Sequence, residues 1–574
     1  MIVPDIAAWC AISFGDDDAN PLYYAEHLFS DEETEITNLV IPEGVTSIGY
    51  CAFCGCSGLT SITIGNSVTS IGNYAFYGCK SLISVTIGVG VLSVGNNAFE
   101  GSSPKKVIWL PNTPPTGYKK LQGAINYVAN NQYIGLSNIT VYPYLSSLFE
   151  VEGVKYVPVN PAERTCDAID CAYDESAENI CISETVTYKG VSLSIKNIKP
   201  YLCYGNKSAK RVNINSKCDI GSQAFYGCSA LFAVELGENV KSIGSESFMN
   251  CSKLNNIVIP DSVASLGDNI FKNCTALKSA KIGNGVKSIP TYAFSGCSSL
   301  TDMQLGNGVA AINGYAFSGC SLLPTIQIPQ NVTVIGNYVF NGCTGMKTVL
   351  FDDGEAKLSL GSNGSNPLFV DCPLDSVYIG RDISYPTAGN SGYSPFYRNT
   401  SLRSVAITDK ETEISMNEFY GCSNLRNVRI GDGVTSFGDW SFSGCRSLDY
   451  FSFGSSVQSI GKEAFSDCVV LTNLISKATT PPLCGSQALE DINKWECTLS
   501  VPRGYIAAYQ QADQWKDFFF MEEKSFEDAI VDVKADDVEE TGYYDLQGRK
   551  QSAPQKGFNI IRYSDGTSKK VFVK

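Results

Sequence analysis

LKSAKIGNGVKSIPTYAFSGCSS, residues 277–299, is the stretch that decides the fold, because its pattern recurs along the chain. Two series of residues repeat at intervals of 23 positions: Phe225, Phe248, Phe271, Phe294, Phe317 and Phe340, and Cys228, Cys251, Cys274, Cys297, Cys320 and Cys343. A fixed period of about 20 to 50 residues is typical of solenoids, in which each unit buries its apolar face against the next. The repeat therefore predicts a stack of similar coils.

Each coil contains one short strand and two turns. In residues 277–282 apolar and polar residues alternate, which favours a strand with alternate side chains pointing inward. Gly283-Asn-Gly285 then turns the chain, because glycine tolerates positive φ. Val286 with Ile289, and Ala293-Phe294, supply two further apolar contacts. We predict a repeat solenoid of the leucine-rich-repeat type, with short parallel β-strands in one continuous sheet per array and an irregular, turn-rich back face.

The cysteines follow the same repeat. Twelve of the 22 stand at one position: Cys56, Cys79, Cys228, Cys251, Cys274, Cys297, Cys320, Cys343, Cys372, Cys422, Cys445 and Cys468. Other coils carry Ser102, Asn206 or Asn399 there, so the position requires a small buried side chain that hydrogen-bonds the turn backbone. We predict a buried ladder of free thiols. If an exported form contains a disulfide, Cys484 and Cys497 outside the ladder are the candidates.

Charge and hydropathy exclude two classes of partner. The net charge is -15 and the pI is about 4.8, which opposes binding to nucleic-acid phosphates and anionic lipid. No apolar run approaches the roughly 20 residues of a membrane span. The opening Met-Ile-Val-Pro lacks the charged and apolar regions of a signal peptide. We expect no nucleic-acid partner and no membrane insertion.

Interruptions of the repeat divide the chain into parts. After Pro114-Pro115 the sequence indicates a helix and then a strand at 139–142. After Pro481-Pro482 it indicates a strand at 498–501 and then a helix at 505–518. Two such endings indicate two arrays. We therefore predict an N-terminal cap at 1–35, a first array with its closing segment at 36–160, a connector with a degenerate repeat at 161–222, a second array at 223–475, its closing segment at 476–522, an acidic linker at 523–540, and an all-β tail at 541–574 with a hairpin at 564–566.

The repeated phrase resembles a known family. IPEGVTSIG at residues 41–49, followed by Ala52-Phe53 and by GCSGL at 55–59, is similar to the BspA-like leucine-rich repeat proteins of bacterial surfaces. The resemblance covers most of residues 36–475, and the segment from Pro481-Pro482 to Trp515 is similar to the ending of that family. It implies export, a role in adhesion or host-protein binding, and no catalysis. The tail is similar to short sorting or anchoring modules, so we expect a cell-surface or secreted protein whose signal peptide has been removed.

A search for catalytic or metal-binding chemistry finds weak candidates. The single histidine, His27, lies outside the arrays, and any Ser-His-Asp or Cys-His arrangement would have to use it. A zinc site at Cys51, Cys54 and Cys56 is a sharper alternative, but Cys56 is a repeat position and no fourth ligand lies within the local spacing. Asp16-Asp-Asp18 lacks the loop pattern of a calcium site. We expect no catalytic residue, no cofactor and no metal.

Binding is expected on the outer face of the strands. The central outward position of each strand is occupied by Thr63, Thr86, Glu235, Val258, Lys281, Gln304, Gln327, Leu350, Tyr378, Ala406, Arg429 and Ser452. The residue type changes at most steps of this series whereas the core positions hardly change, so the face is either shaped by a partner or merely solvated. A second candidate is the position before Ala-Phe, where stacked aromatics would bind a partner or only shield the turn: Tyr74, Tyr292, Tyr315, Tyr338 and Trp440.

From these residues we predict a non-catalytic adhesion or binding protein, expected to be a monomer. Its partner would be a protein, either of the host matrix or of a bacterial surface, and the contacts would involve Lys281, Gln304, Gln327, Tyr378, Arg429, Tyr292, Tyr315 and Tyr338. The alternative is a carbohydrate-binding accessory protein of a nutrient-uptake system. It would use the tyrosines together with the long loops at 352–366 and 381–393.

Overall fold

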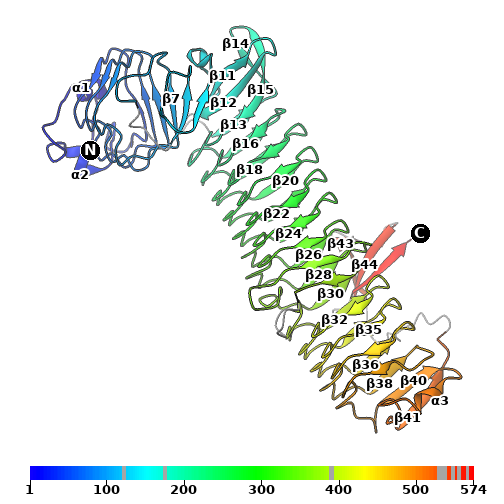
Figure 1. Cartoon of the computed structure of the whole chain (residues 1–574). Coiled ribbons are helices and arrows are strands. Elements are labelled where there is room, and N and C mark those ends of the chain that lie inside the picture. Colours follow the sequence, from blue (N-terminus) through cyan, green and yellow to red (C-terminus); the bar gives the residue numbers. More distant parts are fainter. Residues whose placement is uncertain are drawn as a thin grey trace. The chain divides into compact units, whose positions relative to one another are not determined.

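Figure 1 presents the computed structural model, which describes residues 1–118, 124–171, 178–386, 394–526, 540–544, 550–551, 557–563 and 568–573. The chain forms two compact units, Met1–Cys274 and Thr275–Lys574. Both consist of short parallel strands that recur along the chain. This confirms the predicted solenoid of the leucine-rich-repeat type.

The first array of unit 1 has two ladders of strands. The larger is a six-stranded parallel sheet in the order β1 (Asn38–Val40), β3 (Ser61–Ile64), β5 (Ser84–Ile87), β7 (Lys106–Trp109), β8 (Ile125–Val128) and β9 (Ile139–Val141). The smaller one joins the two-residue strands β2 (Ser47–Ile48), β4 (Ser70–Ile71) and β6 (Ser93–Val94). Its members come from the second apolar pair of each coil. The back of the coil is therefore more regular than the sequence alone suggests.

The remainder of unit 1 links antiparallel strands to new coils. The antiparallel strands are β10 (Phe149–Val151), β11 (Val154–Asn160) and β12 (Thr165–Cys171), and β14 (Thr185–Tyr188) is antiparallel to β15 (Val191–Ile198). β12 pairs in parallel with β15, which continues into β17 (Asp219–Ile220), β19 (Ser242–Ile243) and β21 (Ser265–Leu266). The other ladder of these coils holds β13 (Asn179–Ile182), β16 (Arg211–Ile214), β18 (Ala233–Leu236) and β20 (Asn256–Ile259).

In unit 2 the strands lie side by side along the stack, drawn from green to orange in Figure 1. Along one face these are β22 (Ser279–Ile282), β24 (Asp302–Gln304), β26 (Thr325–Ile328), β28 (Thr348–Phe351), β30 (Ser376–Ile379), β32 (Ser404–Ile407), β34 (Asn427–Arg429), β36 (Tyr450–Phe453), β38 (Asn473–Ser476), β40 (Thr498–Pro502) and β41 (Phe520–Lys524). Backbone pairing is interrupted between β24 and β26 and between β34 and β36.

Unit 2 also has a second ladder of strands, and the C-terminal tail of this unit forms a small sheet. The ladder contains β23 (Ser288–Ile289), β25 (Ala311–Ile312), β27 (Val334–Ile335), β29 (Leu358–Leu360) and β31 (Ile383–Ser384), then β33 (Glu413–Ile414), β35 (Ser436–Phe437), β37 (Ser459–Ile460) and β39 (Leu483–Cys484). The tail forms an antiparallel sheet of β42 (Glu540–Tyr544), β43 (Lys550–Gln551), β44 (Gly557–Tyr563) and β45 (Ser568–Val573). The hairpin expected at 564–566 lies outside the described residues.

Helices are few and short. α1 (Ile6–Cys10) and α2 (Pro21–Ala25) lie in the N-terminal segment, η2 (Leu145–Ser147) is a 3-10 turn, and α3 (Ile506–Tyr509) is the α-helical part of the expected helix at 505–518. A helix was expected after Pro115, but the described residues that follow it include the strand β8. In this strand Asn126, Tyr127 and Val128 are buried, because β8 pairs with β7 and extends the sheet.

The core consists of two columns that run from coil to coil. Within each unit the repeated phenylalanines stack, with ring centroids 5.4 Å apart for Phe53 and Phe76 and 5.7 Å for Phe294 and Phe317. The cysteine column lies beside them, and its thiols donate to backbone carbonyls of the preceding coil. One example is Cys320 Sγ, which lies 3.3 Å from the oxygen of Phe294. The stacked rings and the thiol hydrogen bonds exclude water from the interior and hold successive coils in register.

The ladder position needs a hydrogen-bond donor, as the sequence indicates. Ser102 Oγ donates to the carbonyl of Phe76 over 2.7 Å, and Asn399 Nδ2 donates to that of Cys372 over 2.7 Å. Serine and asparagine thus make the same kind of contact as the thiols. All 22 cysteines are separate thiols in the structure, including Cys484 and Cys497.

Candidate functional site

The outward column of unit 2 contains the strand residues expected to bind. Lys281 pairs with Gln304 across β22 and β24, and Gln327, Leu350, Tyr378, Ala406 and Arg429 are successive neighbours from β26 to β34. Lys281 and Arg429 are exposed, and the others are half-buried. The residues before and after each of them point into the core. Their placement on one outer face follows the prediction, whereas their binding role stays a prediction.

The middle of this column is held by carboxylates of the segment after β28. Tyr378 donates from its hydroxyl to Asp353 Oδ1 over 2.6 Å. Gln327 Nε2 lies 2.9 Å from Asp352 Oδ1. Burial and the hydrogen bond to Asp353 raise the pKa of Tyr378 well above its ordinary value. The phenol therefore stays neutral, and its ring is held in place by this hydrogen bond.

Basic side chains lie on or directly before the two strands that follow β30. Arg403 and Arg426 are exposed and directly precede β32 and β34, and Arg426 N donates to the carbonyl of Arg403 over 3.0 Å. Arg403 Nη1 lies 2.9 Å from Asp375 Oδ1, whereas within the described residues Arg426 and Arg429 form no salt bridge. The charge of Arg429 reaches the Tyr378 hydroxyl and opposes the rise in its pKa. We call Tyr378, Arg403, Arg426, Arg429 and the 38 % exposed Tyr450 of β36 the Arg–Tyr patch.

Sequence reasoning selected only two members of this patch. Arg403 and Arg426 are 23 residues apart, so the repeat itself could have revealed them as neighbours. The strand residues predicted to bind come from one position of each strand, and Arg403 and Arg426 stand at a different position, directly before the strand. Tyr450 was missed for the same reason, since it occupies the first residue of β36.

The tyrosine column forms, but its rings cover one another. Tyr292 and Tyr315 have centroids 4.6 Å apart at an interplanar angle of 15°, and Tyr315 and Tyr338 are 4.7 Å apart at 6°. All three have positive φ, near 56° to 59°, and are half-buried. Both faces of Tyr315 therefore lie against neighbouring rings. The column offers edges and hydroxyls to solvent rather than open aromatic faces.

The two long insertions are anchored to the stack as far as the structure describes them. In the first, Leu358–Leu360 forms β29 of the second ladder. At the start of the second, the buried Arg381 donates from Nη1 to the carbonyl of Val332 over 2.8 Å and from Nη2 to that of Pro329 over 2.8 Å. Residues 387–393, part of the predicted loop, lie outside the described residues.

The corresponding face of unit 1 is covered by the chain itself. Residues 149–171, here the clasp, comprise β10, β11 and β12. They pack on the outer side of the first sheet, where Ile108, Tyr127, Tyr142, Leu145, Val157 and Ile169 form an apolar cluster. Thr86 is only 5 % exposed and Thr63 is half-buried. The expectation that Thr86 forms part of an open outer face is therefore wrong, because a non-repeating segment buries it.

A buried ion pair fixes the clasp to the sheet. Lys106 on β7 forms a salt bridge with Asp170 on β12, and both side chains are almost fully buried. Lys155 Nζ lies 3.2 Å from Asp170 Oδ2, and Ser84 Oγ lies 3.3 Å from the same atom. Burial would raise the pKa of Asp170, but the two lysines hold it below its ordinary value. Removing one partner of such a pair leaves a buried charge, so the clasp is a permanent part of the fold.

A small cavity of about 240 Å³ remains between the clasp and the sheet. Its polar lining includes Asn38, Ser61, Ser84, Glu150, Lys155 and Asp170. The carboxylate of Asp170 is already committed to Lys106, Lys155 and Ser84. The cavity is therefore polar, and its central carboxylate is occupied by side chains of the sheet and the clasp.

The other candidates for chemistry lie apart from this cavity. His27 Nδ1 is 2.6 Å from Glu35 Oε1, and the imidazole is half exposed. Among the described residues, no group of three or more His, Cys, Asp or Glu side chains is placed to hold a metal ion. Nor does any helix in the described ranges have the length and hydropathy to cross a bilayer.

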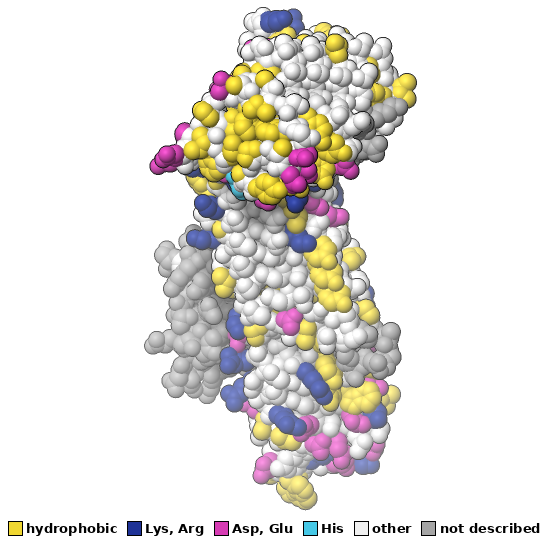
Figure 2. All heavy atoms as spheres, turned by 90° about the vertical axis from the view of Figure 1, so that its left-hand side faces the viewer, with side chains coloured by type: hydrophobic (Ala, Val, Ile, Leu, Met, Phe, Trp, Pro, Cys, Tyr) yellow, Lys and Arg dark blue, Asp and Glu magenta, His cyan; other side chains and the backbone are white. Residues whose placement is uncertain are grey.

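A further apolar surface lies at the N-terminal end of unit 1. In the upper part of Figure 2, hydrophobic side chains gather among Asp and Glu side chains. Exposed apolar residues of this segment include Ile2 at 47 %, Ile12 at 41 % and Tyr24 at 68 %. The Tyr24 hydroxyl donates to Asp18 Oδ1 over 2.7 Å. This surface is acidic and apolar, in contrast with the Arg–Tyr patch.

Comparison with known proteins identifies the repeat. The family model described as BspA type leucine-rich repeat region matches residues 25–121, 196–289, 266–387 and 390–490, with six copies. Among solved structures, a leucine-rich repeat protein from Bacteroides ovatus is 23% identical; the match covers 66% of this chain and 99% of that one, with a TM-score of 0.38. A leucine-rich cell surface protein from Faecalibacterium prausnitzii is 21% identical over 66% of this chain and 95% of that one, with a TM-score of 0.33. No curated protein matches the chain.

Proposed function

Since the chain belongs to the BspA-type leucine-rich repeat family, we propose that it is a non-catalytic binding protein of the bacterial cell surface or exterior, which engages a protein partner through the outer face of unit 2. The Arg–Tyr patch carries this proposal. Arginine and tyrosine are enriched at the residues that dominate protein interfaces. Here Tyr378 lies on a strand that is paired on each side, and the strand of Arg429 pairs with β32.

The mechanism is multipoint contact by a preorganised face. Tyr378 is held by Asp353, so little side-chain entropy remains to be lost when a partner covers it. Arg426 and Arg429 supply positive charge on a chain of net charge -15. A partner with an acidic surface would be attracted to this patch while the rest of the chain repels it, which favours one orientation of binding.

We also propose that the protein is located on the outside of the cell. One solved structure of similar fold bears the description of a cell surface protein. The family supports export, and the tail of the chain would serve in sorting or attachment. Detection of the chain on intact cells by an antibody, without permeabilisation, supports this localisation; detection only after lysis contradicts it.

Carbohydrate binding is the second candidate, and the tyrosine column limits how it could work. Sugars usually stack on an open aromatic face, but both faces of Tyr315 are covered by Tyr292 and Tyr338. A glycan would have to bind through the row of phenol hydroxyls instead. Tyr315→Phe removes one hydroxyl and retains the stack, so it is the appropriate variant for this alternative.

A glycan array and a panel of extracellular-matrix and bacterial surface proteins, probed with the whole chain, separate the two candidates. The proposed function predicts a protein ligand whose binding falls at least tenfold on Arg429→Glu. The matched control is Lys287→Glu, a charge reversal at an exposed residue beside β23, which leaves binding within about twofold. Glycan binding that is lost on Tyr315→Phe, with no change on Arg429→Glu, would favour the second candidate. Equal losses on Arg429→Glu and Lys287→Glu would argue against a localised patch.

A further inference from the structure

Cys51 and Cys54 stand at the two ends of one turn in the first coil. Cys54 N donates to the carbonyl of Cys51 over 3.2 Å, which makes them the first and fourth residues of a β-turn. Cα atoms in such positions are less than about 7 Å apart, and disulfides span about 4.4 to 6.8 Å between Cα atoms. Each of the two thiols influences the pKa of the other, in keeping with their positions at the ends of one turn. Neither residue occupies the ladder position, which in this coil is Cys56.

Other coils show that side chains at these two positions meet. Tyr74 and Tyr77 occupy them in the next coil, with ring centroids 5.6 Å apart. Tyr201 and Tyr204 occupy them further on, with centroids 5.7 Å apart. The contact between Cys51 and Cys54 is therefore a property of the coil and does not depend on one rotamer of the cysteines.

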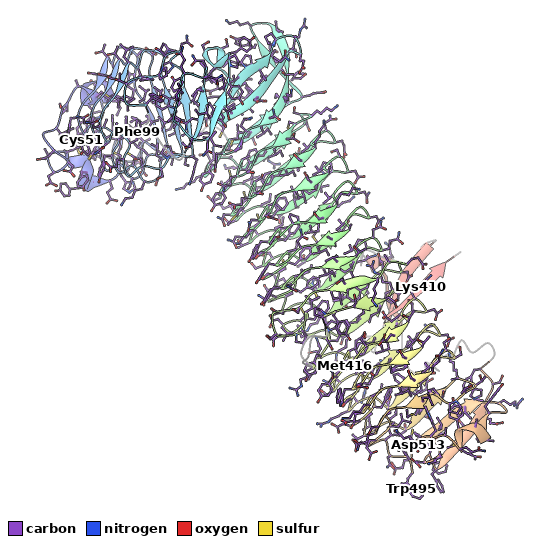
Figure 3. All side chains as sticks on the ribbon, viewed as in Figure 1. Cys51, Phe99, Lys410, Met416, Trp495 and Asp513 are labelled. Carbon is purple, nitrogen blue, oxygen red and sulfur yellow. The ribbon has the colours of Figure 1, made fainter. Side chains whose placement is uncertain are left out.

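The first coil differs because the N-terminal segment covers the pair. Asn20 Nδ2 donates to the carbonyl of Cys51 over 2.5 Å, and Trp9 Nε1 donates to that of Ala52 over 2.7 Å. Both cysteines are at most 1 % exposed. Figure 3 places Cys51 in the N-terminal part of unit 1, beside α2. The turn that carries the two thiols is thus the surface on which the N-terminal segment docks.

We propose that Cys51 and Cys54 form a disulfide when the protein folds in an oxidising environment, by exchange with a small disulfide donor. The thiolate of one cysteine attacks a sulfur of the donor and releases one donor thiol, which leaves a mixed disulfide. The thiolate of the other cysteine then attacks the protein sulfur of that mixed disulfide and releases the second donor thiol. The protein pair loses two electrons and two protons, and the donor disulfide is reduced to two thiols.

The timing of this reaction follows from burial. In the folded, reduced chain, burial raises the pKa of both thiols, so few thiolates are available and the donor has no access. Oxidation therefore occurs before the N-terminal segment docks. Because the ring closed by the bond contains only four residues, the gain in stability through chain entropy is small. The bond instead fixes the turn carbonyls that Asn20 and Trp9 bind.

Refolding of the whole reduced chain in a mixture of reduced and oxidised glutathione tests the proposal. The product is unfolded in denaturant with an alkylating reagent and no reductant, digested, and analysed by mass spectrometry. We expect the peptide containing residues 51–56 to be two hydrogen atoms lighter than its reduced form and to carry the label on Cys56 alone. Label on both Cys51 and Cys54, or glutathione retained on either of them, overturns the proposal.

Two controls make the result specific. In Cys54→Ser, Cys51 has no partner and is expected to be labelled after the same refolding. In the native, reduced chain exposed to oxidised glutathione, we expect the bond to form at least tenfold more slowly than during refolding. An equal rate in both experiments would contradict protection by the N-terminal segment. Neither outcome depends on the partner of unit 2, so this inference and the proposed function fail separately.

Discussion

The hydroxyl of Tyr378 on β30 donates a hydrogen bond of 2.6 Å to the carboxylate of Asp353, which follows the neighbouring strand β28. A side chain at the centre of the outer face is thereby tied to the coil before it. In the proposed function this rigid aromatic ring, which the charge of Arg429 reaches, is the anchor for the partner.

Tyr378→Phe is expected to have a small effect on folding. The change removes one hydrogen bond to a carboxylate in a half-buried site, so the unfolding free energy should fall by about 1 kcal/mol or less. Tyr378→Ala removes the anchor and should weaken binding of the protein partner at least tenfold. Surface plasmon resonance with both variants measures the difference. Unchanged binding by Tyr378→Ala would remove this residue from the site.

Arg381 should be necessary for stability and not for binding. Its buried guanidinium donates to several carbonyls of the segment 328–332, and Arg381→Met leaves these carbonyls without donors. We expect a loss of about 3 kcal/mol or more, seen as a lower midpoint of thermal unfolding. The control Arg403→Met, at an exposed site, should change the midpoint little. Similar shifts for the two variants would show that burial of Arg381 is not what matters.

The cysteine ladder predicts a difference between two substitutions. Cys320→Ser retains a donor to the carbonyl of Phe294, as Ser102 does for that of Phe76, whereas Cys320→Val leaves the carbonyl without one. Cys320→Val should therefore lower the free energy of unfolding by about 1 to 3 kcal/mol, the cost of a buried carbonyl without a donor. Urea unfolding of the two variants provides the comparison. A serine variant less stable than the valine variant would contradict the hydrogen-bonding role.

A thiol count tests the ladder as a whole. Titration of the exported chain in denaturant without reductant should find at least the twelve ladder thiols in the free state. With Cys51 and Cys54 oxidised, 20 of the 22 cysteines would react. A count below about twelve would mean that bridges form within the ladder, as its strand spacing of about 4.8 Å permits.

Two buried glutamates predict a loss of stability at high pH. Burial raises the pKa of Glu418 to about 8, and burial together with the charge of Glu418 also raises that of Glu411. Because the folded pKa lies above the unfolded value of 4.5, the contribution of Glu418 is complete below pH 4.5 and is lost as the pH rises through about 8.

Glu418→Gln isolates this effect. The amide resembles the protonated acid, so the variant should match the wild type near about pH 5 and exceed it near about pH 9 by about 1 to 4 kcal/mol, since one pKa unit corresponds to about 1.36 kcal/mol. Chemical denaturation at the two pH values measures the difference. Glu496→Gln, at an exposed site of the same unit, serves as the control. An advantage of Glu418→Gln that is equal at both pH values would refute the titration.

Periodic features of this protein could be predicted from sequence because every coil repeats the same packing problem. The columns of Phe294 and Cys320 and the outward position of Lys281 are examples. The burial of Thr86 could not be predicted, since the clasp that covers it lies more than 60 residues away and has no repeat. Arg381 and Glu418 could not be predicted for a similar reason, because Arg381 itself and Tyr385, which donates to Glu418, belong to an insertion that occurs once.

The hydrogen bond from each ladder thiol reaches back by about one repeat, to the coil before it. Duplication or loss of a 23-residue module would therefore leave every remaining contact of this kind intact. Such a protein is able to gain or lose length by whole coils during evolution. Each added coil contributes one more outward strand residue on which selection by a partner can act.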